Sequence, residues 1–129
     1  MKKIACLAAV LLVCSARAER PPQSREKADL VLVGEVTKLA TAEEKFGGDG
    51  VKTTYTATVK VDKVEKGKAA GDISVTWFRV TTRPSNPLPG AYGQDHKLKE
   101  NDAARFWLMK EKDGYSVIYN PKGVEKVKE

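Results

Sequence analysis

The amino-acid sequence predicts a mostly β domain in which five strands close into a small barrel. Residues 51–67 alternate apolar and polar side chains for longer than any other stretch, as expected of a strand with one buried face. The alternation changes phase near Asp62 and Lys63, because Val64 takes the apolar role that odd-numbered positions hold up to Val61. We therefore expect a bulge there that bends a strand too long to stay straight in a small domain.

Residues 1–18 have the three parts of a secretory signal peptide. Two lysines form a basic start, an apolar run covers residues 4–14, and a small-x-small cleavage pattern ends at Ala18. The run is too short to span a bilayer comfortably, which takes about 20 residues, and no later stretch is a better candidate. We expect cleavage after Ala18 and a secreted or periplasmic protein whose mature amino terminus is Glu19.

Both cysteines, Cys6 and Cys14, lie inside this segment. A competing interpretation makes Cys14 the lipidated cysteine of a bacterial lipoprotein, although Val13 stands where a small residue is preferred. Cleavage after Ala18 leaves a domain without a disulfide and without a thiolate that could ligate a metal or attack a substrate. It also removes three basic residues and leaves 20 against 17 acidic ones, a net charge of +3 that does not demand nucleic acid.

Residues 19–27 are charged and contain two prolines, so we expect a flexible tether before a single domain at residues 28–129. The first strand is predicted at residues 28–40. It contains four apolar residues in succession, which indicate burial on both faces or at the barrel seam, and Gly34 then marks a bend or a close backbone approach. The glycine-rich turn at residues 47–50 lacks the carboxylate spacing of a calcium-binding loop.

The remaining strands are predicted at residues 73–82, 103–110 and 115–119. In the first of these the apolar role passes from Trp77 to Phe78, which indicates a second bulge of the kind that turns corners in a closing barrel. Helical spacing also fits residues 103–110, but the residues that flank this segment favour a strand. An Asp-Gly pair predicts a tight hairpin before the last strand. Proline and glycine predict a long irregular loop between strands three and four.

Four pieces of the chain, in this order, resemble the netrin-like module, the OB-type barrel in the amino-terminal half of tissue inhibitors of metalloproteinases. They are residues 28–36 (ADLVLVGEV), 64–67 (VEKG), 98–101 with 106–109 (LKEN and FWLM), and 113–117 (DGYSV). The resemblance covers about residues 28–120. It implies a small five-stranded OB-like closed barrel.

The chain departs from that family at its amino terminus. The inhibitors set a mature amino-terminal cysteine against the zinc of the protease, whereas the end expected here is Glu19, followed by a flexible segment. A lipidated Cys14 would have a blocked amine and could not take that role. The resemblance therefore implies a binding module without zinc-directed inhibition.

The only histidine, His96, follows Asp95 in the irregular loop. An Asp-His pair can orient a general base, so a hydrolase that uses Asp95 and His96 is the enzyme hypothesis. A triad also needs a nucleophile and an oxyanion site, and we therefore expect no enzyme activity and a solvent-exposed His96. One histidine without cysteines leaves only carboxylates for a metal, and we expect neither a metal nor another cofactor.

Four aromatic residues lie in adjacent pairs on two predicted strands, so the members of each pair point to opposite faces. Trp77 and Phe106 are predicted to pack in the core, whereas Phe78 and Trp107 are candidates for an outer patch that contacts a partner. Lysines follow the end of the long strand at positions 60, 63, 66 and 68. They form either a basic stripe for an anionic polymer or solvated residues that protect a sheet edge.

Residues 84–92 contain three prolines, so the shape of this loop is partly preset and binding costs less entropy. Arg83, Leu88 and Tyr92 are its candidate contact residues, and a plain long connection is the alternative. We expect an exported, non-catalytic module that binds a protein partner through this loop and the outer aromatic residues. The alternative partner is an anionic polymer, either a glycan or a nucleic acid, bound through the lysine-bearing face.

Overall fold

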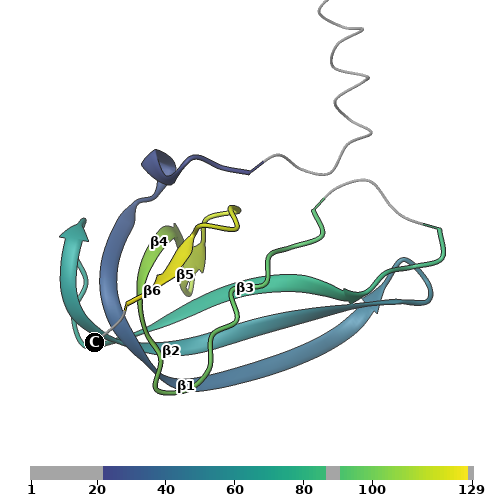
Figure 1. Ribbon diagram of the computed structural model, residues 1–129, viewed down its shortest axis with the longest axis horizontal. Helices are drawn as coiled ribbons and strands as arrows, with labels where there is room; N and C mark the ends of the chain where they lie inside the picture. Colours follow the sequence, from purple (N-terminus) through teal and green to yellow (C-terminus); the bar gives the residue numbers. More distant parts are fainter. Residues whose placement is uncertain (1–21, 87–90, 128–129) are drawn as a thin grey trace, which may run out of the picture.

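The computed structural model describes residues 22–86 and 91–127 (Figure 1). The expected signal peptide and Leu88 lie outside these ranges. The elements are η1 (Arg25–Lys27), β1 (Leu30–Phe46), β2 (Gly50–Lys66), β3 (Asp72–Thr82), β4 (Ala103–Glu111), β5 (Gly114–Val117) and β6 (Val124–Lys126). The fold is mostly β, as predicted. The described ranges form no α-helix, and so hold none that is long and apolar enough to cross a membrane.

Five strands pair in a closed ring. The antiparallel pairs are β1 with β2, β2 with β3, β4 with β5, and β1 with β4, and a short parallel pairing of β3 with β5 completes the ring. The three-residue β6 adds to β4 as a further strand that the sequence did not predict. The five predicted strands are therefore all present, and they are joined as one continuous sheet.

Alternate residues of the ring strands point inward and form the core. Its buried members are Leu30, Leu32, Val36, Ala57, Val59, Val75, Trp77, Leu98, Ala104, Phe106, Leu108 and Val117. The predicted core positions of Trp77 and Phe106 are confirmed, with 7% and 0% of their surfaces exposed. The four successive apolar residues of β1 alternate between buried and half-buried, and the strand pairs with a neighbour on each edge there, so this stretch is the seam of the ring.

β2 bends at the position that the sequence predicts. Along its ladder with β1, the pairing passes from Lys63 to Val61 and leaves Asp62 without a partner. The expected bulge is therefore confirmed, and a second shift close by skips Glu65. Such extra residues increase the local twist of a strand, which lets β2 curve around the core.

The prediction of a second bulge, at Phe78 in β3, is wrong. The β2–β3 ladder runs without a shift from Asp72 to Val80, and its one irregularity follows Val80. Later parts of the chain cover the outer face of β3 and lie along its edge. Phe78 stacks on Tyr119, and residues 92–94 return along the strand, where the Val80 N–H donates to the Tyr92 carbonyl at 2.8 Å.

β1 continues to Phe46, beyond the predicted end at residue 40. Its polar second half pairs in register with β2 as far as the turn at residues 47–49, so backbone pairing compensates for the lack of apolar side chains. Figure 1 shows β1 and β2 side by side, extending together with β3 beyond the group formed by β4, β5 and β6. The ends of β1, β2 and β3 that meet near the turn at residues 47–49 thus project from the ring, and we call them the arm.

The described part of the segment expected as a tether contacts the rest of the domain through Gln23 and Arg25. The Gln23 N–H donates to the Tyr119 carbonyl at 2.6 Å, and Gln23 Oε1 accepts from the Tyr119 N–H at 2.8 Å. The Arg25 guanidinium lies 3.7 Å from the ring centroid of Trp107. Residues 22–27 are therefore fixed by specific contacts, which the charge-rich sequence did not indicate.

Gly34 marks a close approach of β1 to β2, as predicted. A Cβ atom at this position would stand 2.6 Å from Val59 Cγ1 and 2.7 Å from the Lys60 carbonyl oxygen.

We predict that Gly34→Ala lowers the free energy of unfolding by about 1–3 kcal/mol, the usual cost of an overpacked core. Ala40→Val adds volume on the exposed part of the same strand and should change it by less than about 0.5 kcal/mol. Urea unfolding compares the variants, and equal stabilities would contradict the steric role of Gly34.

Candidate binding groove between strands β3 and β5

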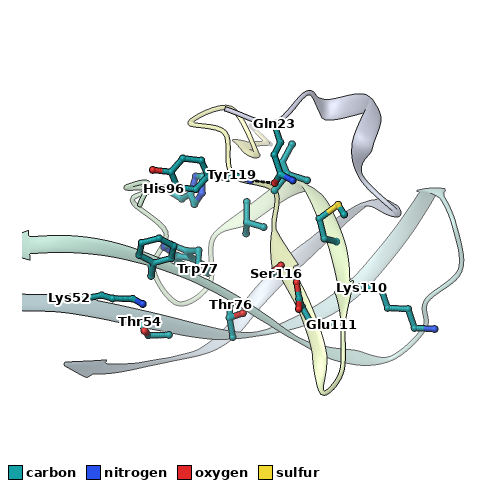
Figure 2. Close-up of a pocket in the computed structure, with 14 residues that line it drawn as sticks. Gln23, Lys52, Thr54, Thr76, Trp77, His96, Lys110, Glu111, Ser116 and Tyr119 are labelled. Atoms are coloured by element: carbon teal, nitrogen blue, oxygen red, sulfur yellow. Dashed lines mark hydrogen bonds between the residues drawn. The ribbon is translucent and has the colours of Figure 1, made fainter. Parts of the chain in front are cut away.

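The ring is least continuous where β3 meets β5. The two strands share only the pairs Val75 with Tyr115 and Thr76 with Ser116, and then they separate. A pocket of about 410 Å³ opens at this point, and Figure 2 shows that its lining residues come from several strands and from the amino-terminal segment. It is lined by Gln23, Lys52, Thr54, Thr76, Trp77, Phe78, His96, Met109, Lys110, Glu111, Ser116, Val117, Ile118 and Tyr119.

One wall of the pocket is the outer face of β2 and β3. Thr54 pairs with Phe78 across the ladder, and alternation along each strand places Lys52 and Thr76 on the same face. Lys52 Nζ lies 4.7 Å from the centroid of the Phe78 ring, which places a cation over an aromatic face. This wall therefore offers hydroxyl groups, one ammonium group and one aromatic ring.

The facing wall is held in place by Tyr119. Its ring stacks on Phe78 with 6.2 Å between centroids, and its hydroxyl oxygen accepts from the N–H groups of Tyr92 and Gly93 at 3.1 Å each. Gln23 is bound to the backbone of the same tyrosine. The aromatic wall is thus rigid before any ligand arrives, which lowers the entropy lost on binding.

His96 lines the pocket and is buried, which corrects the expectation that it is exposed. Only 7% of its surface is accessible, and its ring meets Trp77 edge to face with 5.8 Å between centroids. Its Nδ1 atom is shielded from solvent and has no hydrogen-bond partner. Burial lowers the pKa of His96 to about 4, against a weaker opposing effect of Asp95, so the ring is neutral at pH 7.

Asp95 and His96 do not form the pair that the hydrolase hypothesis requires. The Asp95 carboxylate accepts from Arg79 Nη1 at 3.2 Å and from the Lys97 N–H at 3.0 Å. Among the described residues, no hydrogen bond joins the carboxylate to the imidazole. His96 packs into the domain because its ring covers Trp77, an interaction between distant segments that neighbouring residues in the sequence do not reveal.

A second hollow of about 470 Å³ adjoins the first pocket. It is lined by Ser74, Thr76, Glu111, Lys112, Asp113, Gly114, Tyr115 and Ser116, and it shares Thr76, Glu111 and Ser116 with the first. Ser116 Oγ donates to Glu111 Oε2 at 2.7 Å at this shared boundary. We call the two hollows together the β3–β5 groove. Its charges alternate, because Lys110 and Lys112 flank Glu111, and Asp113 follows.

Of the five residues predicted to contact a partner, only Phe78 lines the groove. Arg83 and Tyr92 contact each other, with the guanidinium 4.7 Å from the ring centroid, and Tyr92 is 9% exposed. Trp107 is half-buried beneath Arg25. Leu88 lies outside the described residues. The sequence missed Gln23, Thr54, Thr76, Ser116 and Tyr119, of which the threonines belong to the polar faces of alternating strands.

The start of the predicted binding loop is tied to the arm. The Asp49 carboxylate accepts from both the N–H and the hydroxyl of Ser85, and these bonds lower the pKa of Asp49. Pro84 is buried, and Phe46 contacts the Tyr92 ring edge to face with 5.5 Å between centroids. The described parts of the loop are therefore anchored at both ends.

The lysine stripe is divided by acidic residues and internal bonds. Lys66 Nζ donates to the carbonyl of Ala28 at 2.6 Å, and Asp62 and Glu65 lie between the lysines. Arg105 forms two bonds to Glu65, at 2.8 and 3.1 Å, and thereby lowers the pKa of this carboxyl. The described residues also contain no cluster of three or more side chains that could hold a metal ion.

Comparisons with family models, with curated proteins and with solved structures found no match. The site must therefore be interpreted from its own geometry. That geometry is two adjoining hollows, one with aromatic walls and an imidazole whose Nδ1 atom has no partner among the described residues, the other polar and of alternating charge. Rings and polar groups that converge in one concavity are typical of a binding site.

The buried His96 predicts a specific loss of stability in acid. Its pKa is about 4 when folded and about 6.5 when unfolded, so the unfolded chain binds more protons between these values and stability falls as the pH drops from 7 to 4. The full difference corresponds to about 3 kcal/mol. His96→Phe keeps a ring against Trp77 and should lack this loss, whereas carboxylates act equally in both proteins. Parallel curves of unfolding free energy against pH would contradict the prediction.

Proposed function

We propose that this protein is an exported, non-catalytic binding module that holds an extended segment of a partner protein in the β3–β5 groove. The observation that carries the proposal is that the two hollows adjoin, since they share three lining residues beside the short contact of β3 with β5. Two adjoining hollows match an extended chain better than a compact metabolite. Hydroxyl groups along it offer hydrogen bonds to a peptide backbone.

An OB-like barrel of the netrin-like type is part of the same proposal. The ring order β1-β2-β3-β5-β4, closed by β1 with β4 and by the parallel contact of β3 with β5, supports an OB-like arrangement. The order of the four netrin-like sequence pieces supports the finer assignment. OB barrels bind their ligands on the face of strands two and three, and one wall of the groove is formed by β2 and β3.

A protein partner is favoured over an anionic polymer by the distribution of charge. The groove places Lys52, Lys110 and Lys112 beside Glu111 and Asp113, so it has no continuous positive surface. The separate lysine stripe on β2 is interrupted in the same way. A polyanion is best bound by uninterrupted positive charge, whereas a peptide can satisfy charges of both signs.

Export is proposed from the signal-peptide pattern of residues 1–18. Mass spectrometry of the mature protein should give Glu19 as its first residue. An acylated Cys14 would replace the soluble form by an anchored one. A retained Met1 in the mature protein would contradict export by this route.

A single substitution tests the groove as the binding site. Thr76 lies where the two hollows meet, so Thr76→Lys should obstruct both. Selection from a random peptide library on the wild-type protein should enrich peptides whose affinity for Thr76→Lys is about tenfold lower or worse, as expected when a central contact is lost. Thr41→Lys, on the exposed part of β1, is the matched control and should bind normally. Failure to enrich any peptide, or equal binding to both variants, would overturn the proposal.

A further inference from the structure

The aromatic end of the groove combines ring-bearing walls with an imidazole whose Nδ1 atom has no hydrogen-bond partner among the described residues. Trp77, Phe78 and Tyr119 line this end together with His96. Phe78 and Tyr119 are stacked on each other, and Trp77 carries the histidine edge to face. If the groove holds a segment of a partner protein, as proposed above, one side chain of that segment must fit among these rings.

The two nitrogen atoms of His96 differ in accessibility. Nδ1 is shielded and unpaired, whereas Nε2 is not shielded in this way, and no hydrogen bond within the described residues engages it. Because His96 lines the pocket and its Nδ1 atom is shielded, Nε2 is the ring nitrogen left for a ligand. A neutral imidazole carries one proton, so Nε2 either donates or accepts, depending on the tautomer.

A hydroxyl group fits Nε2 in either tautomer, because it can donate and accept. A carboxylate can only accept, and it would favour a protonated ring that burial disfavours. An aliphatic side chain would leave the nitrogen unpaired and without water, which is costly. The groove therefore favours a neutral hydroxyl at this position.

The surrounding aromatic rings favour one kind of side chain as the carrier of this hydroxyl group. Aromatic side chains pack favourably against other rings in edge-to-face or offset arrangements, beyond the area that they bury. The pocket volume of about 410 Å³ lies near the lower end of the range for ligand sites, which suits one large side chain with its flanking backbone. Among protein side chains, an aromatic ring with a hydroxyl group is tyrosine.

We propose that the aromatic end of the β3–β5 groove binds a tyrosine side chain of the partner segment. Its ring lies against Phe78 and Tyr119, and its hydroxyl is hydrogen-bonded to Nε2 of His96. The second hollow then holds the neighbouring residues of the same segment. This inference rests on the proposed function for the identity of the ligand, and the chemistry of the pocket can be tested without a partner.

The direct test uses p-cresol, which has the ring and hydroxyl of a tyrosine side chain, and toluene, which lacks the hydroxyl. NMR titration of the wild-type protein should show p-cresol binding about fivefold to tenfold more tightly than toluene, as one hydrogen bond provides. The resonances of Trp77 should shift with both probes, and the Nε2 resonance of His96 should shift with p-cresol alone. This readout needs no variant. Equal affinities, absence of binding, or an unmoved Nε2 resonance would overturn the inference.

His96→Phe supplies the matched variant. It keeps an aromatic ring against Trp77 and removes both nitrogens, so it should bind the two probes with equal affinity. A preference for p-cresol that survives in this variant would assign the hydroxyl to another partner and overturn the role of His96.

Peptide selection separates this inference from the proposed function. Peptides enriched on the wild-type protein should carry tyrosine at one fixed position, and selection on His96→Phe should lose this preference. Enrichment of groove-dependent peptides without tyrosine would overturn the inference and leave the proposed function standing. If no peptide is enriched, the proposed function fails, and the p-cresol titration alone decides the chemistry of the pocket.

Discussion

The fold depends on β1 having a strand neighbour on each edge. Between Leu30 and Glu35 this strand pairs with β4, and the same stretch pairs with β2 on its other side. This double pairing joins the two ends of the sheet and encloses the side chains of Leu30, Leu32 and Phe106. The bulge at Asp62 and the missing side chain of Gly34 let two strands approach and bend together there.

The β1–β4 pairing closes the ring over six residue pairs, whereas the contact of β3 with β5 is short. β3 and β5 share two residue pairs, and the space beyond them is filled by single side chains and by residues 92–96 rather than by a ladder. Polar groups such as Thr76 and Ser116 therefore face a hollow instead of a neighbouring layer. Rigid strands with an open seam give a site whose walls are fixed before a ligand binds.

The strands could be predicted from the sequence because their information is local. Alternation identified β2, the change of phase located the bulge at Asp62, and opposite-facing neighbours placed Trp77 in the core. The groove could not be predicted in this way, because its parts come from segments without a period and meet only through distant contacts. His96 is the clearest case, since nothing around Asp95 indicates that the ring packs on Trp77. Phe78 could be predicted as a contact residue because the alternation of its strand shows which face it occupies.

The same topology sets an order of events in time. β1 and β2 are consecutive in the chain and joined by a turn of three residues, 47–49, so their hairpin closes a short loop. The seam joins Leu30 to Leu108 and must close a far longer one, at a greater cost in chain entropy. Contacts between distant residues form slowly for this reason. We therefore expect the β1–β2 hairpin to form before the ring closes, and the β3–β5 groove, which needs the last strands, to be completed near the end of folding.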